Sequence, residues 1–330
     1  MTPEQVLDEL FGRPTELGVS LACVVMRGGN VIAERYGVRP ANDFQRAEQV
    51  TPETPLLSWS MAKSITHAAV GLLVADGHLD LDGPAPVPEW ADDERSTITL
   101  LDLLEMRSGL RFVEDYLDGD GSHCIEMLFG GTDPSFASYA ARQPLEHAVG
   151  AEFNYSSGTT NIVARIIGDT LAGRSGGSPD ERRAVVESFL HDRLFAPVGM
   201  TSATGRFDES GDFVGSSYVD ATARDFALFG DLYAHDGVTD CGAGTRLLPK
   251  GWLDHARTPT HFDTETGFGY GRHWWLWPTF TGSLACHGYE GQYVVVLPDD
   301  DVVVAHLGKT DVAHQRGVTM TLARLIDSVR

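Results

Sequence analysis

The sequence predicts an α/β protein of the α+β kind, in which one central antiparallel sheet is flanked by helices and carries a mainly helical insertion. Two observations predict this class. β-rich runs lie near both ends of the chain, at residues 19–36 and 283–308, whereas helix-periodic segments dominate between them. We therefore expect N- and C-terminal segments to join in one sheet. At 330 residues the chain is long enough for a single domain with an ample core.

Within this single domain, residues 1–60 and 215–330 are expected to form the sheet lobe and residues 61–214 the helical lobe. Residues 19–36 contain a hairpin signal at Gly28-Gly29-Asn30. Apolar periodicity predicts helices over 3–12, from Ser60 to a stop at Asp76-Gly77, over 98–110 with Thr99 as N-cap and Gly109 as stop, and over 159–173, 181–195, 221–233 and 313–329. Strands are predicted at 283–288, 292–298 and 302–308, with an acidic turn at 299–301.

Bulk composition excludes several function classes. The formal net charge of −22 argues against nucleic acid and anionic membrane surfaces as partners, because both would be repelled. No apolar run approaches a membrane span, and the first residues lack the apolar core of a signal peptide. The four cysteines are scattered, and no cysteine or histidine spacing suggests a metal. We expect a reduced, cytoplasmic protein without metal or cofactor.

Ser60-Met61-Ala62-Lys63 places a hydroxyl and an amine three residues apart at the start of a predicted helix. Residues with this spacing are neighbours on a helix surface. The free N–H groups of a first helical turn also favour developing negative charge. The chain has only three lysines, so a chance match is expected about 0.2 times. Because a lysine amine is protonated in neutral water, its use as a base requires burial that favours the neutral form.

Two further motifs are weak when taken singly. Tyr155-Ser156-Ser157 is followed by glycine and a helical run, so it could be a helix cap with a packed tyrosine. Beside a lysine, however, the phenol pKa would be lowered and the group could exchange protons with a serine or a leaving group. The stretch from Cys286 to Gln292, C-H-G-Y-E-G-Q, is a hairpin turn whose glycines would also admit a substrate close to a backbone N–H.

Taken together and in order, S-x-x-K, Y-S-S and H-G-Y-x-G-Q resemble the serine β-lactamase/penicillin-recognising superfamily. They are most similar to the branch of class C β-lactamases, family VIII carboxylesterases and 6-aminohexanoate-dimer hydrolases. The resemblance covers nearly the whole chain and implies a β-lactamase/transpeptidase-like fold. It implies that Ser60 is the acylated nucleophile, Lys63 its base, and Tyr155 the group that relays a proton to the leaving group.

The resemblance also implies pocket residues. If the K-T-G motif of the family aligns with Cys286-His287-Gly288, the strand donor to the oxyanion is the Tyr289 N–H. If His287 takes the place of the motif's lysine, the donor is the Glu290 N–H. Tyr116 in the E-D-Y stretch matches a substrate-facing tyrosine of the nylon-oligomer hydrolases.

Two departures from the family pattern move the expected substrate away from β-lactams. The lysine of K-T-G, which helps to hold a substrate carboxylate, is absent in either register, and Ser157 replaces the asparagine of Y-x-N. Trp274, Trp275 and Trp277 could line the cleft or pack in the core.

The sequence therefore predicts a serine hydrolase that cleaves small amides or esters through an acyl-Ser60 intermediate. A D-amino-acid peptidase or β-lactamase is the alternative enzyme, and a noncatalytic ligand-binding or scaffold relative is the alternative of another class. A small-molecule substrate is the only partner expected. Monomer and homodimer remain open.

Overall fold

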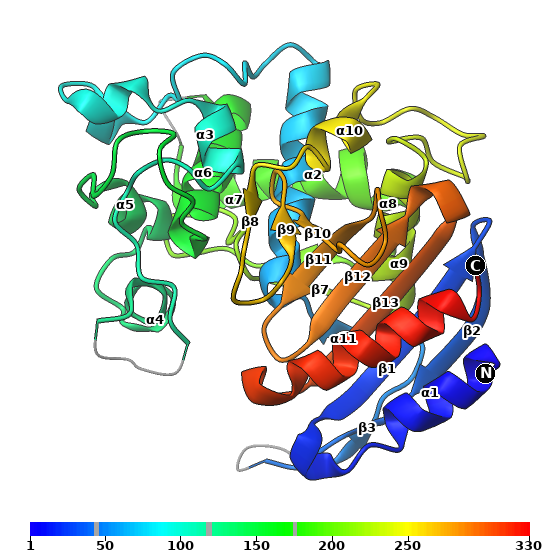
Figure 1. The fold of residues 1–330 in the computed structure, drawn as a ribbon. Helices are drawn as coiled ribbons and strands as arrows, with labels where there is room; N and C mark the ends of the chain where they lie inside the picture. The colour runs from blue at the N-terminus through cyan, green and yellow to red at the C-terminus, as the bar shows by residue number, and fades with distance from the viewer. Residues whose placement is uncertain (43–45, 117–120, 174–176) are drawn as a thin grey trace.

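The computed structural model describes residues 1–42, 46–116, 121–173 and 177–330, and its centre is an eight-stranded antiparallel sheet. The strand order is β2-β1-β13-β12-β11-β10-β9-β8, so the N-terminal hairpin lies against the last strand of the chain (Figure 1). The prediction that both chain ends join one antiparallel sheet is confirmed. The strands of this sheet are β1 Val19–Arg27, β2 Asn30–Tyr36, β8 His261–Phe262, β9 Gly269–Tyr270, β10 Trp275–Leu276, β11 Leu284–Gly288, β12 Gln292–Leu297 and β13 Val302–Lys309.

Strand β1 lies inside the sheet, between β2 and β13. Its residues 20–26 are buried on both faces of the sheet. Gly28 and Gly29 form the predicted hairpin turn with φ of +57° and +68°, a conformation that glycine adopts without steric cost. β13 pairs along the whole length of β1, from Val19 opposite Lys309 to Arg27 opposite Val302.

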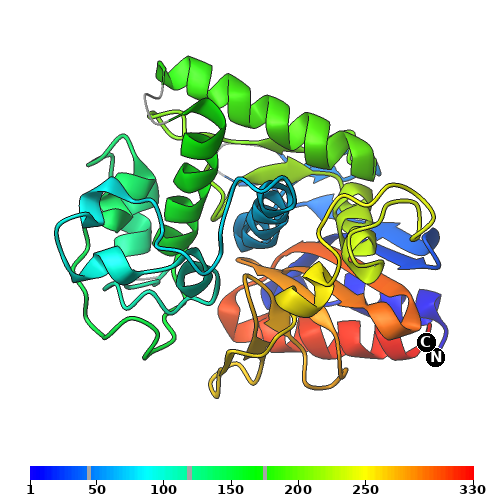
Figure 2. The same ribbon diagram turned by 90° about the horizontal axis from the view of Figure 1, so that it is seen from above.

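Helices cover both faces of the sheet. α1 (Pro3–Phe11) and α11 (Val312–Asp327) run side by side over one face, where Leu10 and Leu322 pack with Val304 in one apolar cluster (Figures 1 and 2). α2 (Ala62–Ala75) and α9 (Ala223–Ala234) pack on the opposite face. The resulting order is helix, sheet, helix, and each apolar face of the sheet is buried.

The remaining helices lie mainly between α2 and α9 in sequence. They are α3 Leu100–Leu104, α4 His123–Phe129, α5 Phe136–Ala141, α6 Ser157–Ala172, α7 Pro179–Leu190, a π-helical segment His191–Phe195, α8 Ala196–Val198 and α10 Trp252–Ala256. Short 3₁₀ turns occupy Thr15–Leu17, Trp59–Met61, Pro88–Trp90, Glu94–Thr97 and Pro298–Asp300. The helical part stands at one end of the sheet, as Figure 1 shows.

The helix predicted over 98–110 is correct at its start and wrong at its end. Thr99 caps α3 in a capping box with Asp102, as expected. The helix ends before Glu105, because Met106 adopts a left-handed φ of +57° that a helix cannot continue through. The stop signal at Gly109 marks a later turn with φ of +76°.

Two small sheets accompany the large one. β3 (Val38–Arg39) pairs with β4 (Glu48–Gln49), and β7 (Val219–Ala221) lies between β5 (Leu56–Leu57) and β6 (Thr204–Gly205). β7 thus pairs with β5, the segment that precedes Ser60, and β6 pairs with the other side of β7. The lobe boundaries at 60/61 and 214/215 stay a prediction. Among the described residues, no helix is long and apolar enough to cross a membrane.

Candidate active site

Ser60 sits in the 3₁₀ turn Trp59–Met61, which leads directly into α2. Ser58 links this turn to the segment that leads into β7. Its hydroxyl lies 2.9 Å from the Trp59 carbonyl oxygen and 3.2 Å from that of Ser217, and it accepts the Val219 N–H at 3.0 Å. The Ser60 side chain is half-buried and lines a pocket. The sequence placed this residue at the helix start because the apolar periodicity begins there.

Lys63 is almost fully buried, with 2 % of its surface exposed. Its Nζ lies 3.0 Å from three oxygens: the Ser60 hydroxyl, the Ser157 hydroxyl and the Ser216 carbonyl. An amine in this position touches the hydroxyl of Ser60 within normal hydrogen-bond distance. The structure therefore brings Ser60 and Lys63 together as their spacing predicts.

The Tyr155 ring packs against the Lys63 amine. Its centroid lies 4.8 Å from Lys63 Nζ, and Ser156, the next residue, caps α6 through the Thr159 N–H. Burial raises the pKa of Tyr155; Lys63 and a hydrogen bond with Ser60 lower it, but by less. The expected lowering of the phenol pKa is therefore wrong in its net direction, because the loss of water costs the phenolate more than the neighbouring amine returns. Tyr155 is a neutral phenol at neutral pH.

Ser157 is the first residue of α6 and faces Lys63. On its other side lies Glu114, a residue that the sequence indicated only as part of the E-D-Y stretch. Glu114 accepts the Ser157 N–H at 2.7 Å and the Ser157 hydroxyl at 2.5 Å, and it bonds the Tyr116 hydroxyl at 2.7 Å. Ser157, which replaces the asparagine of the family's Y-x-N motif, therefore contacts Lys63 on one side and the Glu114 carboxylate on the other.

Strand β11 passes directly against the Ser60 turn at Gly288. A Cβ atom added to Gly288 would lie 2.4 Å from the Ser58 carbonyl oxygen, so only glycine fits there. Tyr289 follows at the pocket mouth, with its ring 5.7 Å from Trp59 and 5.2 Å from Tyr116. Glu290 has a left-handed φ of +63°, and its carboxylate accepts the Trp59 indole N–H at 3.3 Å.

His287 lies behind the site. Its Nε2 accepts the Trp277 indole N–H at 2.7 Å, and its ring stacks on Trp275 at 5.2 Å. Burial lowers the pKa of His287 to about 3, so the ring is neutral. Trp275 separates it from Tyr155, whose ring lies 5.4 Å from Trp275.

The three tryptophans split between the two interpretations of the sequence. Trp274 and Trp277 are buried in the core, whereas Trp275 is half-buried and contacts Tyr155.

A cavity of about 90 Å³ opens over Ser60. Its wall is mainly apolar and aromatic: α4 contributes Cys124, Ile125, Leu128 and Phe129, and the remaining lining residues are Trp59, Ser60, Tyr116, Ser157, Ser217 and Tyr289. None of these lining residues carries a positive charge. A small uncharged group therefore fits this cavity better than a carboxylate.

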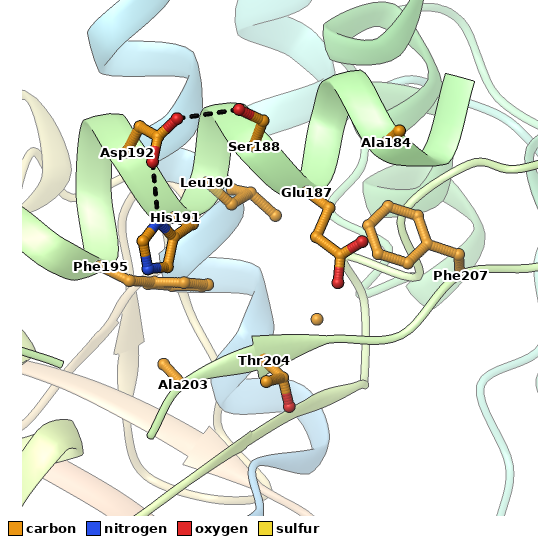
Figure 3. A pocket seen from close by; sticks show the side chains of 11 residues that line it. Ala184, Glu187, Ser188, Leu190, His191, Asp192, Phe195, Ala203, Thr204 and Phe207 are labelled. Atoms are coloured by element: carbon orange, nitrogen blue, oxygen red, sulfur yellow. Dashed lines mark hydrogen bonds and ion pairs between the residues drawn. The ribbon is translucent and has the colours of Figure 1, made fainter. Parts of the chain in front are cut away.

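A larger groove of about 450 Å³ lies between α7 and β6 (Figure 3). It also contains a serine and a histidine, but the carboxylate of Asp192 stands between them. Ser188 donates its hydroxyl to Asp192 at 2.8 Å, and His191 contacts the other oxygen at 2.7 Å. The Ser188 hydroxyl is directed at a carboxylate instead of the imidazole, so the residues that line this groove form no serine–histidine pair.

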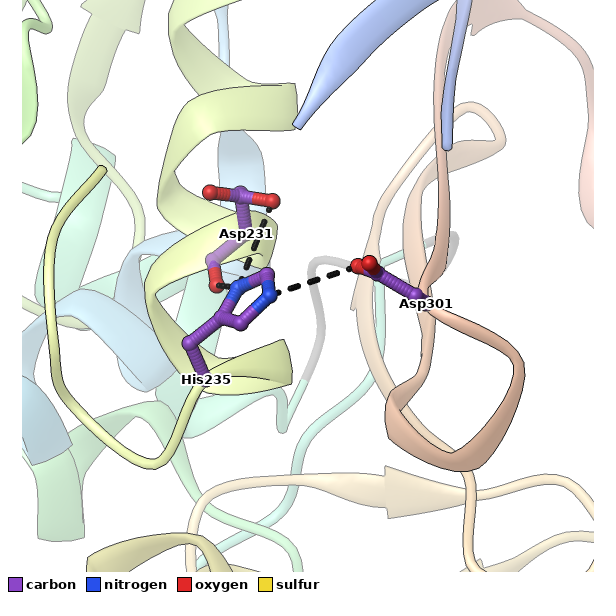
Figure 4. A group of neighbouring side chains, drawn as sticks. All are labelled: Asp231, His235 and Asp301. Carbon is purple, nitrogen blue, oxygen red and sulfur yellow. Dashed lines mark hydrogen bonds and ion pairs between the residues drawn. The ribbon is translucent and has the colours of Figure 1, made fainter. Parts of the chain in front are cut away.

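Asp231, His235 and Asp301 form a group whose spacing would suit a metal ion (Figure 4). His235 lies 3.5 Å from the Asp231 carboxylate and 3.4 Å from that of Asp301, distances that equally suit an ion pair of a protonated ring. The group joins the end of α9 to the turn before β13, apart from the cavity over Ser60. The expected absence of a metal stays a prediction.

A serine and a buried lysine at the start of a helix, beside strand β11 and a tyrosine, are typical of active-site serine proteins with a β-lactamase/transpeptidase-like fold. The model of the Beta-lactamase family matches residues 7–326, and the chain belongs to this family. Its members are usually serine hydrolases.

Solved structures with this fold include a Bacillus anthracis protein whose assignment as a 6-aminohexanoate-dimer hydrolase is provisional, with 20% identity and a TM-score of 0.74 over 99% of this chain and 82% of that one. They also include a family VIII carboxylesterase, with 14% identity and a TM-score of 0.72 over 99% and 95%. A penicillin-binding protein homologue from Caulobacter crescentus has 17% identity and a TM-score of 0.72 over 99% and 95%. No curated protein matches the chain. At these identities the likeness concerns the fold.

Proposed function

We propose that the protein is a serine hydrolase that cleaves small amides or esters through an acyl-Ser60 intermediate, as an amidase or carboxylesterase similar to the 6-aminohexanoate-oligomer hydrolases. The observation that carries this proposal is the 3.0 Å contact between the buried Lys63 amine and the Ser60 hydroxyl. A nucleophile within hydrogen-bond reach of its base is the signature of covalent catalysis. Tyr155 supplies the third group.

In the proposed acylation, Ser60 Oγ bonds to the substrate carbonyl carbon while its proton passes to Lys63 Nζ. The resulting oxyanion is stabilised by the Ser60 N–H and a strand N–H, for which we favour Tyr289 because its side chain lines the same cavity as Ser60. The bond to the leaving amine or alkoxide then breaks. Tyr155, a neutral phenol, gives the leaving group its proton and regains one from Lys63.

Deacylation reverses these roles. A water molecule gives a proton to the lysine–tyrosine pair and its oxygen bonds to the acyl carbon; the ester bond to Ser60 breaks, and Ser60 recovers its hydroxyl proton. Gly288 supports this chemistry indirectly, since it allows β11 to approach the Ser60 turn. Tyr116 and Tyr289 would contact the substrate in the cavity. His287 would not, because the Trp275 ring lies between it and Tyr155.

The mainly apolar wall of the cavity supports an uncharged substrate over a β-lactam, whose carboxylate would meet no cation among the lining residues. Four cysteines without disulfides support the proposed cytoplasmic location, because structural disulfides are rare there.

A serine-directed fluorophosphonate followed by intact mass and peptide mapping tests the proposal. We expect one adduct, on Ser60. Failure of the folded protein to react with this probe and with a panel of small esters and amides would contradict it and favour the noncatalytic alternative. A stable adduct with a fluorescent penicillin on Ser60 would instead favour the peptidase or β-lactamase alternative.

A further inference from the structure

Glu114 is a carboxylate that accepts hydrogen bonds from two residues of the candidate site, Ser157 and Tyr116. Its Oε2 accepts the backbone N–H of Ser157 at 2.7 Å, and its Oε1 is 2.5 Å from the Ser157 hydroxyl and 2.7 Å from the Tyr116 hydroxyl. A backbone N–H can only donate, and carboxylate oxygens accept from N–H and O–H groups. Glu114 is therefore an acceptor for the Ser157 side chain.

This arrangement determines where the Ser157 hydroxyl proton points. A serine hydroxyl has one proton and two lone pairs. When that proton is donated to Glu114, only lone pairs remain to face Lys63, whose Nζ lies 3.0 Å away. Ser157 must then accept an N–H from the lysine.

The Ser216 carbonyl oxygen is a second acceptor for the lysine amine. It also lies 3.0 Å from Lys63 Nζ and has no proton to give. A neutral lysine amine has two N–H bonds and one lone pair, and the two N–H bonds are taken by Ser157 and Ser216. The lone pair is then left for a hydroxyl that can donate to it: that of Ser60, which lies 3.0 Å away, or that of Tyr155, which also contacts the amine. With both N–H bonds taken, the lone pair is free to take the proton of Ser60.

We propose that Glu114 is a positioning residue that holds Lys63 in its base orientation by fixing the direction of the Ser157 hydroxyl. This inference rests on the proposed function, since it concerns the transfer of the Ser60 proton to Lys63 during acylation. Without the carboxylate, the Ser157 hydroxyl can rotate and donate to the lysine lone pair. It then competes with Ser60 for the same site on the base.

The test is the substitution Glu114→Gln, which keeps the size of the side chain and adds an amide that can donate to Ser157. The second-order rate of fluorophosphonate addition to Ser60 is measured from pH 5 to 10. We expect the plateau rate to fall by roughly ten- to hundredfold, part of the ~10²–10⁴ that a general base supplies. The matched control is Glu126→Gln, which removes another carboxylate that accepts a tyrosine hydroxyl, that of Tyr139 at 2.8 Å, and should leave the rate unchanged.

If Glu114 acted through its charge alone, the substitution would change the pH profile and not the plateau rate. Loss of a nearby negative charge favours the neutral amine, so the acidic limb would move to lower pH while the plateau stays constant. That result would overturn the proposal.

A double-mutant cycle with Ser157→Ala separates positioning from a general loss of folding. Once the hydroxyl is absent, Glu114→Gln should change the rate by less than about twofold, whereas additive losses would contradict the inference. Thermal melting of each variant checks that it is folded. If the parental protein itself does not react, the proposed function fails; if it reacts and Glu114→Gln reacts equally at every pH, only the positioning role fails.

Discussion

The cavity over Ser60 and the groove between α7 and β6 each hold a serine beside a titratable side chain, yet their hydrogen bonds run in different directions. At Ser60 the neighbour is an amine, which can become a base and take a proton. At Ser188 the neighbour is the Asp192 carboxylate, whose other oxygen contacts the imidazole of His191. The groove is the larger of the two, about 450 against 90 Å³. In the proposed function, the two places therefore differ in the atom that receives the serine proton, and the volume of the cavity does not decide which serine reacts.

Burial separates the two places further. Lys63 is enclosed by the helices and by the segment before β7, so its contacts act in a medium of low dielectric constant. The His191 and Asp192 side chains are 67% and 63% exposed, and water screens their interaction.

Replacing each serine should give the largest contrast. We expect Ser60→Ala to lower the hydrolysis of p-nitrophenyl acetate by roughly 10³-fold or more, because the nucleophile is lost. Ser188→Ala should retain the parental rate. Steady-state kinetics with both purified variants checks this, and an equal loss in the two would break the comparison.

Tyr155→Phe should have the next largest effect, and its size should depend on the leaving group. An amine leaves only when it is protonated, so small amides should lose about 10²-fold or more in kcat/KM. A p-nitrophenolate leaves without a proton, and its ester should lose much less. Equal losses for both substrates would mean that Tyr155 does not protonate the leaving group.

The pH dependence of amide hydrolysis sharpens the role of burial. A phenol titrates near pH 10 in water, but burial raises the pKa of Tyr155. The protonated form that the proposed mechanism needs therefore persists above pH 10, and kcat/KM should show no alkaline fall up to that value. A fall with a midpoint near 9, in a protein that remains folded by circular dichroism, would contradict this assignment.

The smallest effect is expected from the groove. Asp192→Asn removes the carboxylate that both Ser188 and His191 contact, but these side chains are exposed and such pairs contribute little. Differential scanning calorimetry should give a melting temperature within about 1 °C of the parental value. Ester hydrolysis should also be unchanged, and a clear loss would assign the groove a part in the reaction.

The sequence predicted strands β1, β2, β11, β12 and β13, because each carries a local signal, whereas the two-residue strands β8, β9 and β10 were not predicted. β-branched runs at 292–298 and 302–308 and the glycine pair at 28–29 each carry their own signal, and each lies where the structure has it. The helix expected over 98–110 was too long, because the left-handed turn at Met106 carries no glycine or proline to mark it.

In the site, local spacing found the contact of Ser60 with Lys63, and the family resemblance brought in Tyr155. Glu114 was missed as a site residue, since it contacts Ser157 from 43 positions away and nothing in its own neighbourhood marks it. The direction of the Tyr155 pKa shift was missed for a related reason. The amine beside the ring is visible in the sequence, whereas the depth of burial exists only after folding.

The pairing of β1 with β13 has a consequence for how the chain must be made. Arg27 finds its partner Val302 about 275 residues later. At ~5–20 residues per second, a ribosome needs roughly 14–55 s to supply that partner. If the β1–β2 hairpin forms in this interval, its inner strand, which is buried on both faces in the folded protein, has one unpaired edge. Until the last strand is made, this topology leaves β1 without one of its two partner strands, and an unpaired strand edge can pair with another chain.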